Sequence, residues 1–170
     1  ERIFHNTPLA ISECRRLSNE MAEHARTAII ESVDLIWNYD EQRVEFVRDT
    51  ETLTDKYEDK LGTYFVKISS KSISESESRE IGAYLQIIGD IERICDHSVN
   101  LSQSAAEMND KHISFYRETE SELHILIAAV IEIVTTVINA LQNGDFLSSE
   151  NVEPLEDVID SLCLEIRRRH

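Results

Sequence analysis

Apolar residues recur at every third or fourth position along most of this chain, and residues that interrupt helices are scarce. The 170 residues include only four glycines and two prolines. A spacing of three and four places side chains on one face of an α-helix. The chain is therefore predicted to be all-α, built from long amphipathic helices that pack through their apolar faces.

Cap and turn signals divide this pattern into five predicted helices. Asp40 is suited to cap the second helix, and Ser74 with Glu77 fits a capping box at the start of the third. Gly144 ends the fourth, and Pro154 belongs to the first turn of the fifth or kinks it. Short turns between long rods predict an elongated antiparallel bundle. The predicted helices cover 8–38, 41–69, 75–108, 113–142 and a segment capped by Ser148 or Ser149.

Composition excludes several classes of function. The formal net charge of −16 argues against nucleic-acid binding, which needs Lys and Arg to neutralise phosphates, and against docking on anionic lipid. The most apolar stretch, 123–141, contains His124 and Glu132, so it is predicted to be a buried core helix rather than a membrane span. Three separated cysteines without a CxxC pair indicate a reduced, cytosolic chain without a thiolate zinc site.

Three pairs of carboxylates are spaced four residues apart, which places both members on the same side of a helix, where like charges repel. The first two pairs lie at similar distances from the predicted turn near 71–73, so antiparallel helices would bring them face to face, with Glu58 or Asp90 nearby. Such an oxygen-rich set suits Fe, Mn, Mg, Ca or, less typically, Zn. The alternative interpretation is three solvated edges, because this spacing is common in acidic helices. The pairs are Glu51/Asp55, Glu92/Asp96 and Glu156/Asp160.

Catalytic patterns are missing from the sequence. It has no Glu-x-x-His for a ferritin-like di-iron site, no G-x-S-x-G turn and no glycine-rich phosphate loop. His97 follows the second acid pair and could support it, or simply lie at a helix interface. Cys95 is interpreted as a small buried apolar residue. The chain is therefore predicted not to be an enzyme.

Residues 87–97 together with Asn100 resemble the hallmark segment of the PhoU-domain family, and Glu51 with Asp55 resembles the companion motif on its preceding helix. Other segments resemble a narrower group, the cytosolic PhoU-like C-terminal region of bacterial sodium/phosphate cotransporters. These segments are residues 7–10, 152–160 and 168–170. The resemblance implies tandem three-helix repeats, with a first repeat over 1–110 and an incomplete second repeat of two helices over 111–170.

The resemblance also implies a function. The chain would be a regulatory domain of a sodium-dependent phosphate transporter, on the cytoplasmic face of the cell membrane and involved in phosphate homeostasis. Its partner would be the membrane-embedded part of the same polypeptide or another phosphate-transport protein, and a homodimer is left open. The alternatives are a free-standing PhoU-type regulator of a phosphate ABC transporter and its sensor kinase, or a metal-free helical scaffold.

Multinuclear iron or zinc is implied at the first two acid pairs, with other divalent cations as an option. The ligands would be Glu51, Asp55, Glu92 and Asp96. Glu156 and Asp160 would belong to a second site, and the helix that should face them is not in this chain.

Overall fold

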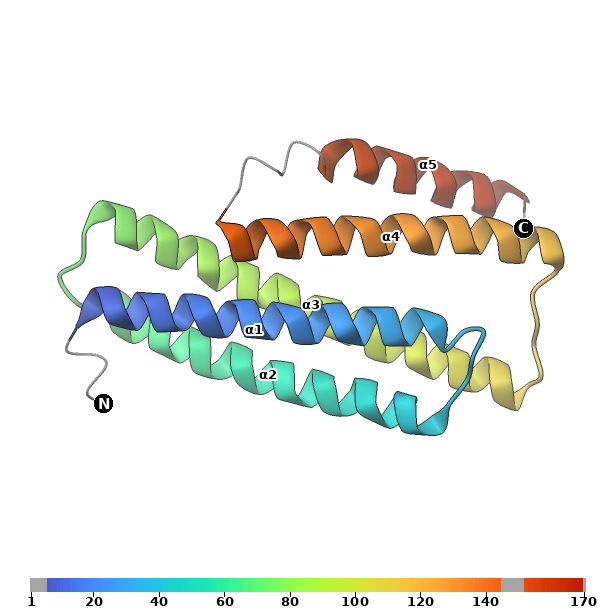
Figure 1. Cartoon of the computed structure of the whole chain (residues 1–170), viewed down its shortest axis with the longest axis horizontal. Coiled ribbons are helices and arrows are strands. Elements are labelled where there is room, and N and C mark those ends of the chain that lie inside the picture. Colours follow the sequence, from blue (N-terminus) through green and yellow to red (C-terminus); the bar gives the residue numbers. More distant parts are fainter. Residues whose placement is uncertain (1–5, 145–151, 170) are drawn as a thin grey trace.

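The computed structural model describes residues 6–144 and 152–169, which form five α-helices and no strand. The helices lie lengthwise beside one another as long rods (Figure 1). The prediction of an all-α helical bundle is confirmed. The helices are α1 Thr7–Asp34, α2 Glu41–Ser69, α3 Glu75–Asp110, α4 Arg117–Asn143 and α5 Val152–Arg169.

Local chemistry explains the helix starts. The Asp40 carboxylate accepts hydrogen bonds from the backbone N–H groups of Gln42 and Arg43, at 2.8 and 3.2 Å. Before α3, the Ser74 hydroxyl accepts from the Glu77 N–H at 3.2 Å, and Glu77 accepts from the Ser74 N–H at 2.8 Å. Both groups satisfy N–H groups that have no partner inside the helix. The predicted caps of α2 and α3 are therefore present.

Two predicted boundaries differ from the observed ones by four residues, and α3 continues two residues past its predicted end at 108. α1 ends at Asp34 rather than at 38. α4 begins at Arg117 rather than at 113, because His112 takes a positive φ of 53° and Tyr116 is extended. Gly144, with a φ of 65°, ends α4 as predicted, since this conformation has no steric cost in glycine. The predicted caps Ser148 and Ser149 lie outside the described residues, and α5 begins at Val152, which puts Pro154 in its first turn.

Replacing Ser74 by alanine should lower the free energy of unfolding by about 0.5–1 kcal/mol, because α3 loses its N-cap hydroxyl. Urea unfolding followed by far-ultraviolet circular dichroism measures the change. Ser72→Ala, in the exposed connection before the helix, is the matched control and should alter stability by less than about 0.5 kcal/mol. Equal losses in the two variants would contradict the role of the capping box.

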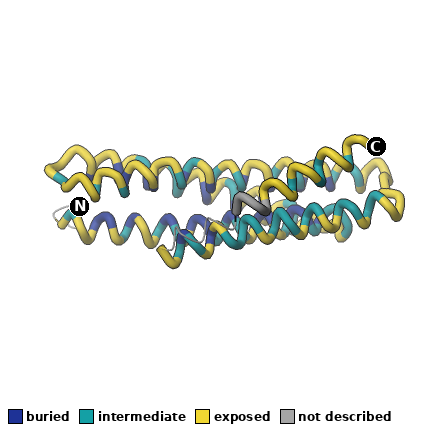
Figure 2. The backbone as a smooth tube through the Cα atoms, turned by 90° about the horizontal axis from the view of Figure 1, so that it is seen from above, coloured by how far each residue is buried: buried dark blue, intermediate teal, exposed yellow. Residues whose placement is uncertain are grey.

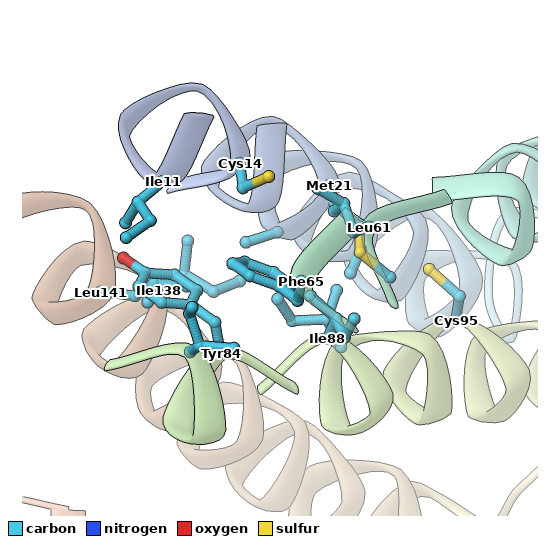
Figure 3. Close-up of a cluster of buried hydrophobic side chains, with 14 of the residues drawn as sticks. Ile11, Cys14, Met21, Leu61, Phe65, Tyr84, Ile88, Cys95, Ile138 and Leu141 are labelled. Atoms are coloured by element: carbon cyan, nitrogen blue, oxygen red, sulfur yellow. The ribbon is translucent and has the colours of Figure 1, made fainter. Parts of the chain in front are cut away.

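The main core lies among α1, α2 and α3. Phe65 of α2 is fully buried and stacks on Tyr84 of α3, with ring centroids 5.8 Å apart. Met21 of α1 is also fully buried, and Figure 3 shows these side chains pointing into one cluster. The apolar stripes of three helices therefore cover one another.

α4 differs from these three helices. It packs against α1 and α5, and only Ile138 and Leu141, near its C-terminal end, are buried. In Figure 2, much of the backbone is coloured as intermediate or exposed residues. The prediction that 123–141 forms a buried core helix was wrong, because α1 and α5 leave most of its apolar residues half-buried or exposed.

Within the described part of the chain, α4 is also one helix that is long and apolar enough to cross a membrane, judged by length and composition alone. Its most apolar window has a mean hydropathy of 2.0, and 6% of that window is buried. Much of the apolar surface of α4 is therefore left exposed by the packing of the five helices.

Polar contacts join α4 to α1. The Gln142 amide donates to Glu23 Oε1 at 2.5 Å, and Arg26 donates to Asn139 Oδ1 at 3.4 Å. Toward the other end of α4, the rings of Trp37 and His124 lie 4.1 Å apart. These contacts position α4 beside the three-helix bundle although little of its apolar surface is buried there.

Candidate metal centre

A buried contact between α2 and α3 sets the level at which the first two acid pairs meet. The Cys95 thiol of α3 donates to Thr54 Oγ1 of α2 at 3.4 Å, and both residues are fully buried. The two helices are antiparallel neighbours (Figure 1). Because Glu51 and Asp55 flank Thr54 in sequence while Glu92 and Asp96 flank Cys95, this contact brings the two pairs to the same level of the bundle.

The electrostatics of Glu92 place its carboxyl group in a negatively charged environment. Burial raises the pKa of Glu92, and the negative charges of Asp96, Glu58, Asp55 and Glu51 raise it further. Among the described residues, every side chain that shifts this pKa is a carboxylate. We call these five residues the carboxylate seam. None of the charges that shift the pKa of Glu92 comes from a basic side chain, which favours either a proton on Glu92 or a bound cation.

Glu58 belongs to the seam, whereas Asp90 does not. A Cβ atom built on Gly89 of α3 would lie 3.9 Å from Glu58 Oε1, so Glu58 reaches across to the backbone of α3 one turn before Glu92. Asp90 is exposed and has Arg93 of its own helix at 3.8 Å. Both residues were expected near the acid pairs from their positions in the sequence. The packing of α2 on α3 brings only Glu58 close to Glu92.

Cys95 lies inside the bundle at the level of the carboxylate seam. Burial, with smaller contributions from the charges of Glu51, Glu92 and Asp96, raises the pKa of its thiol to about 11, against an opposing contribution from the hydrogen bond to Thr54. The thiol is therefore protonated at neutral pH in the absence of a metal ion. Its role is to pack against Thr54 and thereby set the level of the seam.

The seam offers oxygen ligands in a loose arrangement. Among the residues that the structure describes, no group of three or more His, Cys, Asp or Glu side chains is close enough to hold a metal ion. Glu51, Glu58 and Glu92 are half-buried, and Asp55 and Asp96 are exposed. A set of carboxylates without a neighbouring base fits a cation chemically, but the side chains must rotate inward to bind it.

The third acid pair lies elsewhere. Glu156 and Asp160 are exposed on α5, which packs against α4 rather than against α2 or α3. Glu156 faces the same groove as Asp90. The structure therefore does not bring this pair to the carboxylate seam, and a second metal site there stays a prediction.

The comparison with protein families bears on the same helices. The model of the PhoU domain matches residues 18–105, just over half of the chain. The chain belongs to the PhoU domain family. The matched PhoU domain covers most of α1, all of α2 and most of α3, and it includes the whole carboxylate seam. The comparisons with curated proteins and with solved structures gave no match. α4 and α5 lie outside the PhoU match, as do Glu156 and Asp160.

Proposed function

We propose that this chain is a regulatory PhoU domain of a sodium-dependent phosphate transporter, acting on the cytoplasmic face of the membrane. Membership of the PhoU family indicates a regulatory role in phosphate transport. We further propose that this regulation depends on a bound metal ion. The observation that supports this is the carboxylate seam, where two acid pairs meet and no basic side chain offsets the raised pKa of Glu92. The transporter context is supported by the resemblance of 7–10 and 152–160 to the cotransporter group. Regulation rather than catalysis is the proposed activity.

Iron, zinc or another divalent cation would be bound by Glu51, Asp55, Glu92 and Asp96. The positive charge of the ion would compensate their negative charges. Without a cation, Glu92 is crowded by four carboxylates, and their repulsion opposes close packing at this level of α2 and α3. With their charge compensated, the carboxylates can turn inward and hold the two helices together. The outer face of α2 and α3 would then present one fixed shape to the partner.

Combining Asp55→Asn with Asp96→Asn should reduce the iron or zinc that co-purifies with the chain by at least about tenfold. The loss of an outer-shell partner alone lowers metal affinity ~10–100-fold, and this double variant removes two direct ligands. Elemental analysis of the purified protein measures the metal per chain. Both side chains are exposed, so the fold should persist, which circular dichroism checks.

Asp49→Asn with Asp59→Asn provides the matched control, since both are exposed aspartates of α2 outside the seam. This control should keep its metal. Unchanged metal in the Asp55/Asp96 variant, or equal loss in the control, would contradict the assignment of the seam. Glu156→Gln with Asp160→Asn tests separately whether the third pair holds metal.

The transporter context has its own test. Sodium-dependent phosphate uptake should be misregulated when Asp55→Asn and Asp96→Asn are introduced into the full-length protein in cells, while the Asp49/Asp59 control behaves as wild type. A reading frame that continues upstream of Glu1 into several apolar segments of about 20 residues is expected. A start codon at that position would favour the free-standing regulator of an ABC transporter instead.

A further inference from the structure

An apolar groove separates α3 from α4, on the side of α3 away from the carboxylate seam. Its volume is about 510 Å³. Ile87, Ile91 and Ile94 of α3 line one wall, and Ile133, Val134 and Val137 of α4 line the other. Val137 is 46% exposed, so this wall is open to solvent. The groove is an apolar feature that the helices of the bundle leave open to solvent.

The spacing of the lining residues suits a helix as occupant. On α3, Ile87 and Ile94 are half-buried and lie two helical turns apart on one face, and the buried Ile91 forms the floor between them. On α4, steps of four and three lead from Ile133 to Val137 and Ala140, which are half-buried or exposed. Stripes with this alternation pack against another helix with side chains fitting between those of the neighbour. A helix with its own apolar stripe would therefore bury both walls at once.

The charges at the rim restrict the chemistry of that helix. Asp90 and Glu156 are the charged residues that line the groove within the described part of the chain. Arg93 lies 3.8 Å from Asp90, whereas both carboxylates remain exposed. The chain as a whole carries a net charge of −16. A partner helix with Lys or Arg beside its apolar stripe is complementary to this surface, and another acidic chain is not.

We propose that the α3–α4 groove binds an amphipathic helix of a partner protein, with an apolar stripe flanked by Lys or Arg. The groove uses none of the seam carboxylates and requires neither a metal ion nor phosphate. This binding therefore goes beyond the regulatory function proposed above, and either proposal can fail without the other.

Fluorescence anisotropy with the full chain tests the groove. The probe is a labelled synthetic helix of ~18 residues, about 27 Å long, with Leu at helical spacing and Lys at the flanks. Val137→Gln should weaken binding at least about tenfold, as expected for a central apolar contact. Ile125→Gln is the matched control on the same helix, 58% exposed and outside the groove, and should change affinity less than about twofold.

The rim charges are tested by combining Asp90→Asn with Glu156→Gln, two exposed positions that should not disturb folding. This variant should bind the Lys-flanked peptide about 3–10-fold more weakly at low salt, and the difference should shrink at high salt because exposed charges are screened. A peptide with Glu in place of Lys should bind more weakly than the original. Loss of these differences would overturn the charge requirement.

Three further outcomes would overturn the proposal as a whole. The first is equal binding of a scrambled peptide with the same composition. The second is the absence of binding by the amphipathic peptide to the wild-type chain. The third is a concentration-dependent dimer, detected by sedimentation velocity and abolished by Val137→Gln, which would assign the groove to a second copy of this chain.

Discussion

Phe65→Ala is expected to lower the free energy of unfolding by about 3–5 kcal/mol, the range for truncating a buried phenylalanine. Phe65 is fully buried among α1, α2 and α3 and stacks on Tyr84. Its removal leaves a cavity at the point where three helices meet, and rigid neighbouring helices cannot close that cavity fully. Urea unfolding followed by circular dichroism measures the loss.

The adjacent residue provides the control for this prediction. Val66 is 58% exposed, so Val66→Ala changes an apolar side chain on the same helix without opening a cavity. Its effect should stay within about 0.5 kcal/mol. Similar destabilisation by both substitutions would mean that Phe65 does not lie at the centre of the core.

Glu92→Gln is expected to stabilise the chain at neutral pH and to remove part of its pH dependence. Four carboxylates neighbour Glu92, and repulsions of this kind each contribute ~0.2–0.5 kcal/mol. Replacing the charge by a neutral amide should therefore raise the free energy of unfolding by about 1–2 kcal/mol at low ionic strength. High salt should reduce the gain by screening.

The direction of the pH dependence follows from the raised pKa of Glu92. Below the ordinary glutamate pKa of 4.5, Glu92 is protonated in both the folded and the unfolded chain. As the pH rises, the unfolded chain loses this proton first, so the free energy of unfolding falls until the folded pKa is passed. Wild type and Glu92→Gln should therefore have increasingly different stabilities from about pH 4.5 upward.

Urea unfolding of both proteins across this pH range measures the difference between their free energies of unfolding. Contributions of other titrating groups are shared by the two proteins and cancel in this difference. Glu118→Gln, at an exposed position on α4, is the control and should show no such growing difference. A constant offset between wild type and Glu92→Gln at all pH values would contradict the crowding of Glu92. Saturating metal should reduce the stabilisation by Glu92→Gln if the seam binds a cation.

Much of the local structure could be predicted from short-range patterns. Asp40, Ser74 and Gly144 act through backbone groups within a few residues, so their roles follow from chemistry that the neighbouring sequence already contains. The level at which the acid pairs meet was also predictable in outline, because helix rise and turn position limit the register of two antiparallel neighbours. The contact between Thr54 and Cys95 could not be predicted, since a hydroxyl on an apolar stripe does not reveal its partner.

The periodic apolar residues by themselves determined that this chain forms long helices, and the spacing of the acids determined which carboxylates share a helix face. Only the tertiary structure decided which faces are covered. Residues 123–141 have the composition of a core helix, yet few residues of α4 are buried, because burial depends on which neighbours pack against a helix. The same dependence places Glu58 in the carboxylate seam and leaves Glu156 at the groove, although both lie on acidic helix edges.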